Sequence, residues 1–353
     1  MEFISEYGLF LLKTITLVGA IVVVIGLIAS ASMRNKQDSE GELVVKRLND
    51  DLDDYKEALE DAILSKEELK AQHKQRQKED KAKAKEEKKR IKSEQPSEEE
   101  KKRVFVLDFN GDVKASEVDL LRHEITAVLT EATKDDEIVL RLESPGGMVH
   151  TYGLAASQLQ RIRDKGIPLT ICVDEVAASG GYMMACLGDK IIAAPFALIG
   201  SIGVLAQVPN FNRLLKKHDV DYELFTAGKY KRTVTMLGEN TEEGREKFRS
   251  DLEETHALFR SHVGKFRPQL DVEAVATGEV WYGQQAVDNK LIDEVGTSDD
   301  YLVKACDAAD VYSIRFEYKK TLQEKLGVGV QAAIEKAATT VLNRIQQQNI
   351  SKS

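Results

Sequence analysis

The sequence predicts an α/β fold with a largely parallel sheet, preceded by a membrane helix and a charged helical stalk. From residue 103 onward, apolar runs of strand length alternate with stretches of helical length. Strands that alternate with helices form crossover units, which give a parallel sheet covered by helices. An uncharged run near the N-terminus and a charged stretch after it predict the two extensions. The 353 residues leave room for one large domain and both extensions.

The first element is an uncharged segment, residues 14–33, whose length matches a membrane helix. At a rise of about 1.5 Å per residue, it just spans the hydrocarbon core of a bilayer. The alternative is a cleaved signal peptide, because residues 29–31 (ASA) have the small side chains of a cleavage site. Acidic residues, and no basic ones, precede Lys13, whereas a signal peptide begins with basic residues. We therefore predict an uncleaved anchor within residues 1–33.

The next segment, residues 34–102, is predicted to be a charged helical linker. Residues 48–69 place apolar side chains at the spacing of a short coiled coil of about three heptads. Residues 81–92 are strongly basic, and Pro96 marks the end of the helical pattern. A solvated spacer is one interpretation. An arm that oligomerises or touches anionic headgroups is the other.

The following segments form the predicted core of the α/β domain. The expected elements are a strand at 104–109, a helix at 116–133, a strand at 137–142, a helix at 149–165 and a strand at 168–173. Of these strands, the one at 137–142 is expected to be buried.

The C-terminal segment, residues 321–353, is predicted to form an amphipathic helix, because its apolar residues recur at helical spacing. Packing within the core or between subunits is the first interpretation, and a membrane contact is the alternative.

Composition excludes several classes of protein. The formal net charge of −9 argues against a general nucleic-acid binder, whose surface is basic. Cys172, Cys186 and Cys306 lack the spacing of a metal site. No phosphate-binding loop or cofactor fingerprint is found. We therefore expect no metal, cofactor or nucleic-acid partner.

Three short segments carry candidate chemistry: 143–147 (ESPGG), 174–182 (DEVAASGGY) and 227–232 (AGKYKR). A serine that heads a glycine turn has an accessible hydroxyl, and backbone N–H groups in such turns can hold an oxyanion. A buried lysine can be neutral and can act as the base. Together the segments indicate a nucleophile, its base and an oxyanion hole for acyl transfer at a peptide carbonyl.

Within these segments, Ser179 is the candidate nucleophile, at the point where a strand and loop give way to a helix. The N–H groups of Gly147 and Gly180 are the candidate oxyanion hole. Lys229 and Lys231 both remain candidates for the base, because side chains two residues apart share a face of an extended segment. His150 is the histidine nearest to a motif, but nothing places a carboxylate behind it, so we expect it to face solvent or cap a helix.

These segments, together with 200–203 (GSIG) and 278–286 (GEVWYGQQA), resemble the signal peptide peptidase A family of serine–lysine membrane peptidases, peptidase family S49. Among its members, the shorter, SohB-type inner-membrane proteases are the most similar. The resemblance covers residues 103–318. It implies the spiral fold of Clp protease and crotonase for a peptidase domain at 103–320.

The resemblance also assigns roles to individual residues. The family spacing of glycine and lysine selects Lys231, counted from Gly228, as the general base in place of Lys229. Ser201 matches the second serine of the family, which orients the lysine through a hydrogen bond.

The sequence therefore predicts a membrane-anchored serine endopeptidase with a Ser–Lys dyad, active through an acyl-enzyme on short apolar peptides such as signal-peptide remnants. The expected partners are these peptides, the lipid bilayer and further copies in a homo-oligomer. The expected location is the bacterial inner membrane, crossed once. Basic residues after the anchor favour a cytoplasmic domain, whereas the family's link to signal peptides favours the periplasm, which we prefer. Two alternatives are a silent scaffold of the same fold and a crotonase-like acyl-CoA enzyme.

Overall fold

The computed structural model describes residues 41–65 and 102–318, together with Thr16, residues 67–69 and isolated lysines between 74 and 85. Among these residues, no helix is both long enough and apolar enough to cross a membrane. Apart from Thr16, the predicted anchor lies outside the described part of the chain, and so does the predicted C-terminal helix.

The chain divides into two compact units. One comprises residues 44–315 and holds every candidate site residue. The other comprises residues 1–43 and 316–353, of which the structure describes only Thr16 and residues 41–43 and 316–318.

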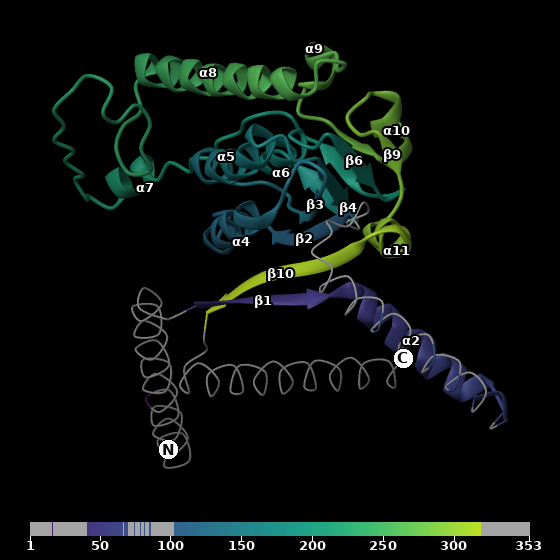
Figure 1. Ribbon diagram of the computed structural model, residues 1–353. Helices are drawn as coiled ribbons and strands as arrows, with labels where there is room; N and C mark the ends of the chain where they lie inside the picture. The colour runs from purple at the N-terminus through teal and green to yellow at the C-terminus, as the bar shows by residue number, and fades with distance from the viewer. Residues whose placement is uncertain are drawn as a thin grey trace, which may run out of the picture. The chain divides into compact units, whose positions relative to one another are not determined.

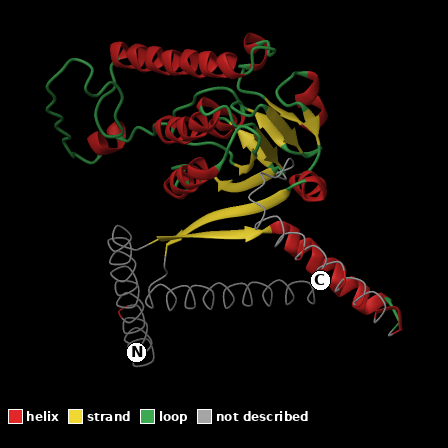
Figure 2. Cartoon of the chain, in the orientation of Figure 1, coloured by secondary structure: helices red, strands yellow, loops and turns green. Residues whose placement is uncertain are grey.

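Figure 2 shows the helices and strands of the described residues. In chain order the elements are β1 (Gly41–Arg47), α2 (Leu48–Ile63), β2 (Arg103–Asn110), α4 (Val118–Glu131), β3 (Glu137–Glu143), α5 (Val149–Asp164), β4 (Leu169–Val173), β5 (Val176–Ala178), α6 (Gly180–Ala185), β6 (Lys190–Ala193), β7 (Leu198–Gly200), α7 (Asn212–Lys217), α8 (Glu242–Phe266), α9 (Val272–Val275), β8 (Val280–Tyr282), α10 (Gly283–Asp288), β9 (Glu294–Val295), α11 (Ser298–Ala308) and β10 (Asp310–Tyr318).

The main sheet has seven strands in the order β1-β10-β2-β3-β4-β6-β9. Each neighbouring pair from β10 to β9 is parallel. One row of the register joins Leu107, Leu140, Ile171 and Ile191 across β2, β3, β4 and β6. The predicted mixed α/β fold with a largely parallel sheet is thus confirmed.

Both faces of this sheet are buried. Leu107 and Leu140 point into a large core that includes α4, α5 and α6. Val106 and Val139, one residue earlier on each strand, point into a second core that includes α11. The alternation follows from the pleat of the strands, and Figure 1 shows α11 on the other side of the sheet from α4 to α6.

A second sheet of three strands, in the order β5-β7-β8, branches from the end of β3. The branch point is a parallel bridge between Ser144, directly after β3, and Ala177 in β5. β5 is only three residues long and leads straight into Ser179. The small sheet therefore places Ser179 beside the carboxyl end of β3.

The start of α2 belongs to the folded unit, although the sequence suggested a linker there. The amide of Asn49 donates hydrogen bonds to the carbonyls of Cys306 and Ala309, at 3.0 and 2.9 Å. The same amide accepts the N–H of Val311 at 2.9 Å. Helix α2 buries none of its own residues, so a coiled-coil partner for it stays a prediction.

Candidate active site

Ser179 joins β5 to α6 in a backbone conformation that residues other than glycine rarely adopt. Its φ is 53° and its ψ is −117°. Such conformations cost of order 1–3 kcal/mol and cluster at functional sites. The Ser179 N–H donates to the carbonyl of Gly200 at 2.8 Å, and its carbonyl accepts the N–H of Met183 at 2.9 Å. Hydrogen bonds to its N–H and its carbonyl thus fix the backbone of the turn, while the Ser179 hydroxyl has no hydrogen-bond partner among the described residues.

The glycine loop after β3 lies directly against this turn. Gly146 has a φ of 89°. A Cβ atom at Gly146 would lie 2.6 Å from the nitrogen of Gly180 and 2.7 Å from the Cβ of Ser179. The N–H groups of Gly147 and Gly180 have no acceptor in the part of the chain that the structure describes. The structure thus brings the predicted nucleophile and both predicted oxyanion donors to one place.

An apolar cleft adjoins Ser179 between α6 and α8. Its lining includes Val149, Met183, Val204 and Phe259, together with Gly147 and Ser179. The cleft has a volume of about 10 Å³, roughly the room that one water molecule needs. An apolar substrate side chain would have to widen it.

Ser201, the predicted second serine, lies close to the same turn. It follows Gly200, whose carbonyl holds the Ser179 N–H. Ser201 itself has a positive φ of 49°, and its N–H donates to the carbonyl of Glu279 at 2.6 Å. Its hydroxyl has no hydrogen-bond partner among residues 102–318.

Lys231, the predicted base, is not brought to Ser179. It lies in the long connection between α7 and α8, which extends away from the main sheet (Figure 1). The side chain is exposed. Its backbone N–H donates to the carbonyl of Gly228 at 3.1 Å, but its ammonium contacts no acceptor among the described residues. The two halves of the predicted dyad are therefore apart within one chain.

Neither rival base is placed to act. The ammonium of Lys229 forms an ion pair with Glu243 at 2.7 Å. The hydrogen bond with Glu243 raises the pKa of Lys229, which keeps it charged and unable to accept a proton. His150 is exposed at the start of α5, as expected for a solvent-facing residue.

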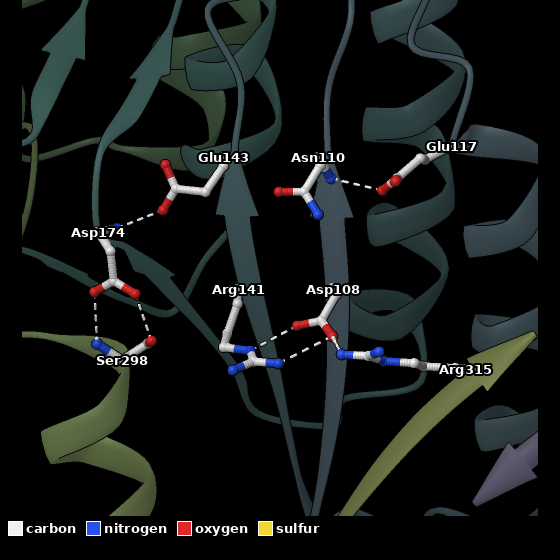
Figure 3. Close-up of polar contacts among 8 residues, drawn as sticks. All are labelled: Asp108, Asn110, Glu117, Arg141, Glu143, Asp174, Ser298 and Arg315. Atoms are coloured by element: carbon white, nitrogen blue, oxygen red, sulfur yellow. Dashed lines mark hydrogen bonds and ion pairs between the residues drawn. The ribbon is translucent and has the colours of Figure 1, made fainter. Parts of the chain in front are cut away.

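Sequence reasoning missed a carboxylate that supports the turn. Glu143 ends β3, and its carboxylate accepts the N–H groups of Asp174, Glu175 and Val176 at 2.6–3.1 Å. Figure 3 shows the bond from Asp174. Burial raises the pKa of Glu143, although these bonds favour the ionised form. The segment that leads from β4 into β5 is thus held by one side chain. The sequence pattern that could have indicated this role is an acidic residue at the end of an apolar strand, directly before a glycine turn.

A second charged group links neighbouring strands on the same face (Figure 3). Asp108 of β2 accepts two hydrogen bonds from Arg141 of β3, at 2.6 and 3.0 Å, and one from Arg315 at 2.9 Å. Asp108 and Arg141 are partners in the sheet register. The pairing explains why an arginine interrupts an otherwise apolar strand.

Comparisons with known proteins match both halves of the chain. The family models described as Peptidase family S49 N-terminal and Peptidase family S49 match residues 2–159 and 161–312. A Haemophilus influenzae protein named Probable protease SohB is 50% identical over 344 residues, 97% of this chain and 96% of that protein. Buchnera aphidicola subsp. Acyrthosiphon pisum has a protein of the same name, 56% identical over 230 residues, 65% of this chain and 68% of that protein. Another, from Buchnera aphidicola subsp. Schlechtendalia chinensis, is 47% identical over 304 residues, 86% of this chain and 99% of that protein. The matched ranges include every segment that builds the site.

Proposed function

The chain belongs to peptidase family S49, as its motifs predicted, and we propose that it is a membrane-anchored serine endopeptidase with a Ser–Lys dyad. The observation that carries the proposal is the strained turn at Ser179, which lies beside two backbone N–H groups that have no acceptor among the described residues. A hydroxyl held in this way, next to unused donors and an apolar cleft, suits nucleophilic attack on a peptide carbonyl. The apolar walls of the cleft favour extended, apolar peptides such as signal-peptide remnants.

In the proposed reaction, neutral Lys231 takes the proton of Ser179 as the serine oxygen attacks the carbonyl carbon. The carbonyl electrons move onto oxygen, and the N–H groups of Gly147 and Gly180 bind that oxyanion. When the intermediate collapses, the leaving amine takes the proton from Lys231, and an acyl-enzyme remains. Water, deprotonated by the same lysine, then attacks the acyl carbon. The bond to the Ser179 oxygen breaks, the lysine returns the proton to that oxygen, and the acid is released. Ser201 would orient the lysine.

This chemistry requires Lys231 to leave solvent, because burial lowers the pKa of a lysine enough to make it a base. We name residues 205–240 the arm. It exposes many large apolar side chains: Leu205, Val208, Phe211, Leu214, Val220, Tyr222, Leu224, Phe225, Tyr230, Met236 and Leu237. Exposed apolar surface of this extent is typical of an interaction site. A homo-oligomer in which the arm packs on a neighbouring copy would bury both this surface and Lys231.

The nucleophile is tested with the purified full chain and its Ser179→Ala variant. We expect hydrolysis of a fluorogenic apolar peptide to fall by on the order of 10⁴-fold or more. A fluorophosphonate probe should label wild type and leave the variant unlabelled. Wild-type hydrolysis by the alanine variant would end the proposal.

The origin of the lysine is tested by mixing two inactive variants, Ser179→Ala and Lys231→Ala. If the arm of one copy serves the serine of another, mixed oligomers regain a fraction of the wild-type rate. If the arm folds back onto its own chain, the mixture stays inactive, and the intersubunit arrangement is refuted.

A silent scaffold of the same fold is the second candidate, favoured by the exposure of Lys231 and its separation from Ser179. A scaffold predicts that Ser179 resists the fluorophosphonate probe even in the assembled protein. Labelling of Ser179 that disappears in Lys231→Ala would exclude the scaffold hypothesis, because it would show that the lysine activates the serine.

The proposed location is the bacterial inner membrane, with residues 14–33 as the anchor and the catalytic domain in the periplasm. A membrane-impermeant fluorophosphonate should then label Ser179 in cells whose outer membrane alone has been permeabilised. Labelling that appears only after the inner membrane is opened would place the domain in the cytoplasm.

A further inference from the structure

Behind the catalytic turn lie two fully buried hydroxyls, those of Ser144 and Tyr152, which the proposed chemistry does not use. Their oxygens are 2.5 Å apart. The Tyr152 oxygen is also 2.8 Å from the carbonyl oxygen of Asp112, and the Ser144 oxygen is 3.0 Å from the nitrogen of Gly146. The two side chains therefore connect the start of one loop to the glycine loop of the site.

The donors and acceptors of this group can be assigned without ambiguity. The Asp112 carbonyl can only accept, so the single hydroxyl proton of Tyr152 goes to it. The Ser144 hydroxyl must then donate to the Tyr152 oxygen. The Gly146 N–H donates to the Ser144 oxygen. Every proton has one acceptor, which gives a chain of hydrogen bonds with a defined direction.

Both side chains also fix the turn by contact. The ring of Tyr152 packs so closely on Gly180 that a Cβ atom there would lie 2.4 Å from the ring. The backbone of Ser144 donates to the carbonyl of Val176 at 2.7 Å and accepts the N–H of Ala178 at 3.0 Å. These strands lead directly into Ser179. Thus one pair of residues touches the segments that carry both oxyanion donors and the nucleophile.

We infer that Tyr152 and Ser144 are a positioning pair, which sets the Gly147 and Gly180 N–H groups at their working distance from the carbonyl that Ser179 attacks. The inference rests on the proposed function. Oxyanion donors act only when they lie about 2.7–3.1 Å from the developing charge, and an error of about 1 Å can cost on the order of 100-fold in rate. Neither hydroxyl touches substrate. They act through the peptide groups that they hold.

The first test compares Tyr152→Phe with Tyr182→Phe. Tyr182 is also fully buried, and its hydroxyl donates to the carbonyl of Leu291 at 2.8 Å. Both variants therefore lose a buried hydrogen bond to a backbone carbonyl, and only Tyr152→Phe also loses the bond from the Ser144 hydroxyl. We expect kcat of Tyr152→Phe to fall about 10-fold or more below that of Tyr182→Phe, with KM unchanged within about two-fold. Phosphonylation of Ser179 should slow by the same factor, because that adduct uses the same donors.

The second test is Ser144→Ala, which removes the acceptor of the Gly146 N–H and covers the case in which Tyr152→Phe fails to fold. Rates are compared at a temperature where near-UV circular dichroism shows each variant to be folded. We expect about a 10- to 100-fold loss of kcat, and a double variant that loses little more than Ser144→Ala alone, because the pair acts as a unit.

The outcomes separate this inference from the proposed function. If Ser179→Ala is inactive but kcat of the folded Tyr152→Phe or Ser144→Ala equals that of Tyr182→Phe, the positioning role is refuted and the nucleophile stands. If Ser179→Ala stays active, the proposed function itself fails.

Discussion

Replacement of Gly146 by alanine tests the contact between the glycine loop and the turn at Ser179. The new Cβ atom would lie 2.6 Å from the nitrogen of Gly180 and 2.7 Å from both the Ala178 carbonyl oxygen and the Ser179 Cβ. Two of these three neighbours are backbone atoms, so they cannot rotate away. The backbone must shift by several tenths of an ångström, and Ser179 must shift with it.

The expected loss of stability in Gly146→Ala combines two effects. Alanine at the positive φ of 89° costs roughly 1–2 kcal/mol, and overpacking of a buried site costs about 1–3 kcal/mol. We therefore expect the free energy of unfolding of Gly146→Ala to fall by about 2–5 kcal/mol. Because the free energy of unfolding of most domains is about 5–15 kcal/mol, the variant should still fold. Its kcat should fall by on the order of 100-fold, because the nucleophile and the oxyanion donors move relative to each other.

Gly153→Ala is the matched control, since Gly153 lies inside α5 with nothing within 4 Å of an added Cβ atom. An alanine in the middle of a helix should raise the free energy of unfolding by about 0.5–1 kcal/mol and leave kcat unchanged. Urea denaturation and the fluorogenic peptide assay measure both quantities. The reasoning fails if Gly146→Ala unfolds at the same urea concentration as Gly153→Ala and hydrolyses the peptide equally fast.

Three further predictions concern other parts of the chain. Burial opposes the ionisation of Asp136, but hydrogen bonds from Arg103 and Thr133 outweigh it and lower its pKa from 3.8 to about 2. This carboxylate should therefore contribute about 2 kcal/mol to the free energy of unfolding above pH 3.8, and that contribution should be lost as the pH falls toward 2. Urea denaturation of Asp136→Asn at a series of pH values should lack this acid-dependent loss. Lys231→Ala and Lys231→Arg should both abolish peptide hydrolysis, whereas Lys229→Ala should retain most of it; the reverse pattern would move the base two residues upstream. The mature chain should begin near residue 1 and require detergent for extraction, and a soluble product that begins near residue 32 would instead show a cleaved signal peptide.

The α/β core could be predicted because its strands are buried on both faces. Such strands read as continuous apolar runs, and the helices between them carry the helical period. The meeting of Ser179, Gly147 and Gly180 was also predictable. Two backbone segments can approach this closely only where glycine replaces a residue whose Cβ atom would collide, so the close approach is visible in the sequence as glycines.

Other features left no such trace. The hydroxyl of Tyr152 reaches Ser144 only because α5 packs against the end of β3, and nothing in its own sequence neighbourhood indicates that partner. Strand β10 pairs with β2 from the far end of the domain, a contact that local patterns do not encode. The exposed position of Lys231 follows from the long connection between α7 and α8, for which the sequence offers no clear strand or helix pattern.

The side chain of Asn49 has a practical consequence for anyone who wishes to isolate the catalytic domain. It supplies the hydrogen-bond partner of three backbone groups, at the end of α11 and the start of β10. A fragment trimmed to the apparent start of the domain at residue 103 would expose these groups and free the edge strand β10 for pairing with other molecules. We expect such a fragment to aggregate even though it lacks residues 14–33. A soluble preparation should therefore begin before residue 41, where β1 starts.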